Sequence, residues 1–104
     1  MQYDVYANPS ARSAEAFPYL VDIQSDLLSA LATRMVVPLA VRLTAASDIP
    51  QRLCPIMVLA GNDFVLVPYQ AAPLLKTQLK KKVGTVRDHA SAIVAAIDAV
   101  VSGI

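Results

Sequence analysis

Residues 54–68 read CPIMVLAGNDFVLVP, and this stretch decides the fold class. Two aliphatic runs, Cys54 to Ala60 and Asp63 to Pro68, have the length and composition of β-strands. The Gly61-Asn62 pair between them is a two-residue turn signal, so we expect a hairpin of antiparallel strands. Strands joined by hairpins and short loops form antiparallel sheets, because parallel neighbours need long crossover connections.

Four other segments are predicted to add strands to this hairpin. Three of them are rich in β-branched or aromatic residues or alternate apolar with polar residues; they are Met1 to Tyr6, Tyr19 to Gln24 and Arg34 to Leu43. Leu74 to Lys82 is expected to form the last strand before the C-terminal helix. Loop composition marks the connections at Asn8 to Pro18, Ala45 to Pro50 and Tyr69 to Pro73. Pro38 lies inside a predicted strand, and because proline cannot donate to a ladder it indicates an edge position or a bulge.

The last stretch of the chain, VGTVRDHASAIVAAIDAVVSGI from Val83 to Ile104, is typical of a helix. We expect it to run from about Thr85 to Val101, with Thr85 as N-cap and Gly103 as its stop. Apolar residues recur at helical spacing: Val86, Ala90, Ile93, Ile97 and Val101. The prediction is a single domain over residues 1–104, mainly β (β + α), with a small antiparallel barrel-like sheet of five or more strands and one C-terminal α-helix.

The composition indicates an oligomer and gives no reason to expect a nucleic-acid ligand. Hydrophobic residues make up 56% of only 104 residues, and there is no Trp. A short chain cannot bury that much aliphatic surface alone, so we expect a homodimer. The net charge is +1, and the one basic run, Lys80 to Lys82, is interpreted as a solvated loop or strand edge. We expect no direct binding of nucleic acid, which needs a clustered basic face.

Candidate catalytic and metal-ligating residues are few, and we predict no catalytic residue, metal or cofactor. Cys54 and His89, the only residues of their kinds, share no ligand spacing. Cys54 is expected to be a buried thiol, which fits a reducing compartment and a cytoplasmic protein. No signal peptide and no run of membrane-spanning length is expected.

Two aspartates near the end of the Tyr19 to Gln24 strand are interpreted structurally. Asp22 lies on an apolar strand and is expected to pair with Arg34 or Arg42 across the sheet. Ser25 and Asp26 have the chemistry of a turn that ends the strand. Leu27 and Leu28 follow as an aliphatic pair with an exposed character.

Three blocks of this sequence resemble the CcdB family, the toxin half of a bacterial toxin–antitoxin pair. The first block is MQYDVY at the start of the chain. The second comprises LVDIQSDLL and RMVVPL, which match a strand, a Gln-Ser-Asp turn, an aliphatic pair and an Arg-Met strand ending in Pro-Leu. The third is the terminal helix that closes in Gly103-Ile104. Together they cover roughly half of the chain in the right order.

The resemblance implies a homodimer that binds the A subunit of DNA gyrase and traps its cleaved DNA complex. That is stoichiometric poisoning, so the toxin itself would not be an enzyme. A cognate antitoxin, disordered in its C-terminal part, would wrap the dimer and neutralise it. A remote alternative is a ribonuclease toxin of the same fold, as in the MazF and Kid group, but the net charge disfavours a basic RNA groove.

The same resemblance assigns site residues. The gyrase-binding residues would be Leu27, Leu28, Gly103 and Ile104, and the antitoxin-binding residues would be Gln2, Tyr6, Ser25 and Asp26. An open alternative is that the aliphatic members of these sets fill the core or the dimer interface.

One departure from the family pattern concerns the C-terminal tip. The family has an aromatic pair ending in Trp before Gly-Ile, whereas this chain has Val101 and Ser102, and Asp98 stands where the family has a neutral polar residue. A central Trp can contribute ~2–4 kcal/mol to an interface, which corresponds to roughly 30- to 1,000-fold in affinity. The alternative hypothesis is therefore a degenerate, non-toxic homologue that keeps the dimer and antitoxin binding.

Overall fold

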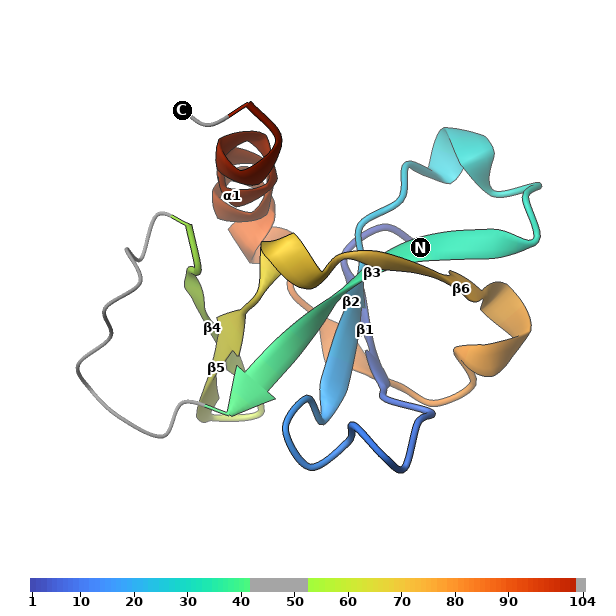
Figure 1. Cartoon of the computed structure of the whole chain (residues 1–104), viewed down its shortest axis with the longest axis horizontal. Coiled ribbons are helices and arrows are strands. Elements are labelled where there is room, and N and C mark those ends of the chain that lie inside the picture. Colours follow the sequence, from blue (N-terminus) through green and yellow to red (C-terminus); the bar gives the residue numbers. More distant parts are fainter. Residues whose placement is uncertain (42–52, 103–104) are drawn as a thin grey trace.

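The computed structural model describes residues 1–41 and 53–102 (Figure 1). Its strands are Asp4–Ala7 (β1), Tyr19–Asp22 (β2), Thr33–Val41 (β3), Ile56–Leu59 (β4), Asn62–Leu66 (β5), Ala72–Leu75 (β6) and Lys82–Thr85 (β7). One α-helix, Ala90–Ser102 (α1), follows them. Four single-turn 3-10 helices lie between these elements: Asp26–Leu28 (η1), Pro68–Gln70 (η2), Lys76–Gln78 (η3) and Arg87–His89 (η4).

All strand pairs are antiparallel, and the sheet curls into a half-barrel. The strand order is β4-β5-β3-β2-β1-β7, and β6 pairs with the first half of β3 while β5 pairs with the second half. Figure 1 shows α1 beside β4, β5 and η2 at the open side of the curled sheet. The predicted fold class, a mainly β protein with a barrel-like antiparallel sheet and a C-terminal helix, is confirmed.

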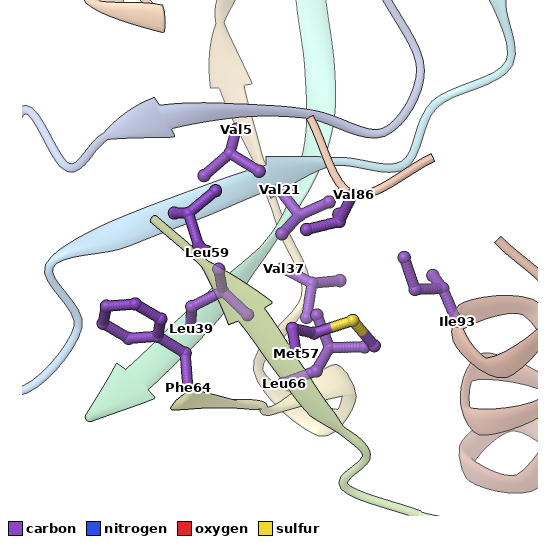
Figure 2. Close-up of a cluster of buried hydrophobic side chains, with 10 residues drawn as sticks. All are labelled: Val5, Val21, Val37, Leu39, Met57, Leu59, Phe64, Leu66, Val86 and Ile93. Atoms are coloured by element: carbon purple, nitrogen blue, oxygen red, sulfur yellow. The ribbon is translucent and has the colours of Figure 1, made fainter. Parts of the chain in front are cut away.

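The hydrophobic core lies inside the curl and is closed by the helix. Strands β1 to β5 contribute most of the core side chains, and Val86 and Ile93 approach from the C-terminal segment (Figure 2). Ile93 and Ala96 are fully buried, and Ile97 packs against the same cluster. The sulfur of Cys54 is buried as predicted, and burial raises the pKa of its thiol. None of the helices in the described parts of the chain is long and apolar enough to cross a membrane.

The predicted β4–β5 hairpin is present, but its turn lies one residue earlier than expected. Leu59 pairs with Asn62, so the two turn residues are Ala60 and Gly61. Both have positive φ, 53° and 81°, which is the conformation of a type I′ turn. The expected Gly61-Asn62 turn was therefore wrong, because the glycine occupies the second turn position and Asn62 begins β5.

Pro38 is neither at a sheet edge nor in a bulge, contrary to prediction. It lies in the middle of β3 opposite Leu20 of β2. On the other side of β3, pairing with β6 ends at Val36 and pairing with β5 begins at Leu39. The carbonyl of Pro38 accepts a hydrogen bond from Val67 on that side, 3.0 Å away. The missing N–H therefore faces the gap between two partner strands, where no ladder bond is lost.

The segment predicted as one strand from Leu74 to Lys82 forms two strands separated by η3. β6 pairs with β3, and β7 pairs with β1. The outer edge of β6 has no free N–H group: Pro73 has none, and the N–H of Leu75 donates to Gln78 Oε1 at 3.3 Å. The next N–H, of Lys76, faces β3 and donates to Ala32 O.

The ends of the sequence differ from prediction in their boundaries. β1 begins at Asp4, because Tyr3 has a φ of 71° and interrupts the extended chain. Thr85 ends β7, and its hydroxyl accepts the N–H of Arg87. It is not the N-cap of α1, because η4 lies between Thr85 and the start of α1 at Ala90. The predicted loop at Ala45 to Pro50 and the expected helix stop at Gly103 lie outside the described residues.

The turn of the hairpin offers a test of this register. We expect Ala60→Asn to stabilise the protein by about 0.5–1 kcal/mol, because Asn tolerates positive φ better than Ala. Gly61→Ala is the matched opposite: nothing lies within 4 Å of the added Cβ, so its cost of about 1 kcal/mol reflects the backbone conformation alone. Urea unfolding of the three proteins measures both changes. Equal stability of all three would contradict the type I′ turn.

Candidate functional site

A short turn after β2 presents the aliphatic pair to solvent. Ser25 caps η1, and its Oγ accepts the N–H of Leu27 at 3.2 Å. The N–H of Leu28 donates to Ser25 O at 3.0 Å. The side chain of Leu27 is 95% exposed and that of Leu28 is 49% exposed. The predicted turn role of Ser25 and Asp26 is confirmed, and Leu27 does not belong to the core of this chain.

A buried ion pair lies beneath this turn. Arg34 Nε is 2.8 Å from Asp22 Oδ2, and Arg34 Nη2 is 3.0 Å from Asp22 Oδ1, so the contact is bidentate. The side chains of Asp22 and Arg34 are 2% and 7% exposed, respectively. The hydrogen bonds to Asp22 raise the pKa of Arg34. Of the two predicted partners of Asp22, Arg34 is therefore confirmed, while Arg42 lies outside the described residues.

The same guanidinium reaches the turn itself. Arg34 Nη2 donates to Gln24 O at 2.9 Å and to Asp26 Oδ1 at 3.3 Å. The backbone N–H of Gln2 donates to the same Asp26 oxygen at 3.1 Å. That backbone hydrogen bond is the main cause that lowers the pKa of Asp26, and the hydrogen bond from Arg34 lowers it further. The start of η1 is thus anchored to the sheet and to the N-terminal segment.

The N-terminal segment brings three of the four predicted antitoxin-binding residues together. Gln2 contacts Asp26 through its N–H, and Gln2 Nε2 donates to Ile23 O at 3.1 Å, so Gln2, Ser25 and Asp26 form one surface. Tyr6 lies on β1, two residues from Asp4 and on the same face of the strand. Burial and the negative charge of Asp4 raise the pKa of Tyr6, with a smaller contribution from Asp22.

Asp4 adds a second buried carboxylate close to this surface. Its Oδ2 is 3.2 Å from the α-amino group of Met1 and 3.4 Å from Lys82 Nζ. Lys82, the last residue of the basic run Lys80 to Lys82, therefore forms an ion pair with Asp4 on the neighbouring strand β1. Tyr3, which has a positive φ, lies between Met1 and Asp4 in a turn. The N–H of Asp4 donates to Met1 O at 3.0 Å and closes this turn.

The C-terminal part of the candidate site lies at the end of α1. Val101 is 80% exposed, so the helical spacing that it shares with Ile93 and Ile97 does not place it in the core. Only the first part of α1 packs on the core, through Ile93, Ala96 and Ile97, and the last turn extends beyond it. Ser102 Oγ donates to Asp98 O at 2.6 Å. Gly103 and Ile104 lie outside the described residues.

The turn that includes Leu27 and the last described turn of α1 are separate in a single chain. Figure 1 shows η1, in cyan beside the N-terminus, on one side of the molecule and the end of α1 on the other. One chain therefore does not join η1 and the last turn of α1 into a single patch. Within the described residues, no group of three or more His, Cys, Asp or Glu side chains is arranged to hold a metal ion.

Sequence reasoning missed two features of this region. One is Gln24, whose carboxamide contacts three backbone groups around the turn. The other is an apolar groove of about 330 Å³ on the sheet face opposite the core, lined by residues that include Phe17, Leu20 and Val36. A Gln next to a Ser-Asp turn was a usable signal for the first feature. The groove had none, because it forms from segments far apart in the sequence.

Comparison with known proteins assigns almost the whole chain to one family model. The model described as CcdB protein matches residues 2–103. A comparison with individually curated proteins gives no match.

Asp26 makes the stability of the protein depend on pH in a defined direction. Its pKa in the folded protein lies below the ordinary value of 3.8, so ionised Asp26 stabilises the fold above that value. The contribution disappears as pH falls through the lowered pKa. We therefore expect the stability advantage of the parent protein over Asp26→Asn to be full near about pH 6 and to shrink below about pH 4. Urea unfolding across this range measures it, and a pH-independent difference would contradict the assignment.

Proposed function

Because the chain belongs to the CcdB family of toxins from toxin–antitoxin pairs, we propose that it binds and poisons the A subunit of DNA gyrase. The observation that supports this proposal most directly is Leu27. An almost fully exposed leucine on a turn anchored by buried charges has no role in packing its own chain. Apolar side chains held in place at a surface are typical anchors for a protein partner.

We propose that the active form is a homodimer. Val94 and Val101, seven residues apart, lie on one face of α1 and are exposed in the single chain. Burial of such a face against a second copy removes it from water, and two-fold dimers are the commonest way to do so. A dimer also presents two copies of each site, which lets one partner contact η1 of one protomer and α1 of the other.

We further propose that an antitoxin neutralises the protein at the surface formed by Gln2, Ser25 and Asp26, together with Tyr6. These residues adjoin Leu27, so one partner excludes the other by direct overlap. Asp26 keeps an exposed carboxylate edge, which suits a basic group in an extended antitoxin segment. The proposed location is the cytoplasm, where gyrase acts and where a lone Cys54 remains reduced.

Leu27→Asp tests the gyrase proposal. We expect the parent protein at micromolar concentration to stabilise gyrase-cleaved DNA and to stop growth on overexpression, and the variant to lose both effects. An exposed side chain can be exchanged without loss of stability, which thermal unfolding checks. Val58→Asp, at an exposed valine on β4, is the matched control and should remain active. If the parent protein leaves both gyrase and growth unaffected, the proposal is wrong.

Ser102 supports a second candidate function, a non-toxic homologue that retains the dimer and antitoxin binding. The hydroxyl of Ser102 donates to Asp98 O in the same helix. A serine side chain offers a partner no aromatic surface at this position. We expect Ser102→Trp to tighten binding to the gyrase A subunit by roughly 30- to 1,000-fold. Calorimetry on both proteins measures it, with Ser91→Trp, at an exposed serine in the first half of α1, as control. Unchanged affinity would show that the missing aromatic does not limit binding.

A further inference from the structure

The side chain of Gln24 replaces a piece of β-sheet backbone. Its Oε1 accepts the N–H of Met35 at 3.0 Å, and its Nε2 donates to Thr33 O at 3.1 Å. Both groups lie on the edge of β3 that faces β2, since Met35 O on the same edge accepts the N–H of Ile23. The carboxamide therefore gives β3 the acceptor and the donor that two successive peptide units of a longer β2 would supply.

This substitution has a structural consequence for the turn. The edge of β3 would lose its partners where β2 ends at Asp22, and unpaired backbone groups are costly. Because the side chain of Gln24 satisfies them, the main chain is free to leave the sheet and to form η1. The N–H of Gln24 itself donates to Asp22 Oδ1 at 3.0 Å, which fixes the direction in which the chain leaves.

The second N–H of the carboxamide reaches the turn. Gln24 Nε2 also donates to the carbonyl of Leu28 at 3.3 Å, at the end of η1. Asp26 holds the start of η1 through Arg34, so the single turn is attached at both ends. Leu27, between these attachments, has no packing of its own and takes its position only from its backbone.

We propose that Gln24 is a positioning residue, which holds η1 in the conformation that presents Leu27 and Leu28 to the gyrase A subunit. The inference rests on the proposed function. Its physical basis is preorganisation: a turn that is already ordered loses less conformational freedom on binding, and the affinity rises accordingly. Gln24 acts through the backbone of the turn and needs no contact with the partner.

Gln24→Glu is the sharpest variant, because Glu has the same shape and keeps the acceptor for Met35 N–H. It removes both donors and places a carboxylate against the carbonyls of Thr33 and Leu28. We expect about tenfold weaker binding to purified gyrase A subunit by calorimetry. In a background that carries both Leu27→Ala and Leu28→Ala, the same change should cost less than about twofold, since both positioned side chains are already absent. An equal cost in both backgrounds would overturn the positioning role.

Gln78→Glu is the matched control, since this glutamine also accepts a backbone N–H through Oε1, a bond that Glu retains. It should bind as the parent protein does. If Gln24→Glu fails to fold, Gln24→Met removes both donated bonds and also the bond from Met35 N–H, without adding charge.

Hydrogen exchange separates this inference from the proposed function. The amides of Leu28, Ser29 and Leu31 donate inside or next to η1. In Gln24→Glu they should exchange faster, while the amides of β1 and β2 stay unchanged. Unchanged exchange in the turn would overturn the inference even if gyrase binds. A parent protein that does not bind gyrase refutes the proposed function, and the exchange measurement still decides the role of Gln24.

Discussion

The bidentate contact between Arg34 and Asp22 organises the half of the molecule that contains the candidate site. Asp22 ends β2 and Arg34 lies near the start of β3, so the pair closes the base of the ten-residue connection between them. Both charges are buried, and loss of either partner leaves the other uncompensated in a low-dielectric interior. The remaining donors of Arg34 extend this constraint to Gln24 O and Asp26. The buried ion pair thereby ties the turn above it to the two strands.

The polar contacts of Asp22, Arg34 and Asp26 lie below the turn, and the exposed side chain of Leu27 lies at its surface. The N-terminal segment contributes Gln2, whose backbone N–H stabilises the ionised form of Asp26. The same segment includes Tyr3, in a backbone conformation that bulky residues rarely adopt. Such a conformation persists only where the surroundings determine it, and such residues cluster at binding sites. Order in the turn comes from buried polar groups, and the apolar side chain of Leu27 is left free for a partner.

The sequence predicted the elements of this fold better than their connections. The β4–β5 hairpin was predicted, yet its register was not. A turn at Gly61-Asn62 and the observed turn at Ala60-Gly61 both place Met57, Leu59, Phe64 and Leu66 on one face. The apolar pattern cannot distinguish two registers that differ by two residues in pairing.

Similar reasons explain the other errors in the fold and the site. Pro38 lies in a gap between two partner strands, which no local rule reveals. In contrast, the pairing of Asp22 with an arginine was predicted correctly, because an apolar strand cannot leave a charge unpaired. The role of Gln24 depends on its contacts with β3, and the sequence alone does not show that this strand lies beside it. The exposure of Val101 depends on where α1 leaves the core.

The outer edge of β6 is poorly suited to pairing with a strand from a second copy of this protein. An exposed strand normally attracts strands from other chains, because its outward N–H and C=O groups can extend the sheet. On β6 the outward N–H of Leu75 is already bound by Gln78, and Pro73 has none. A strand approaching there finds acceptors without donors and cannot form a regular ladder. This bonding pattern therefore disfavours extension of the sheet from β6 by a second copy.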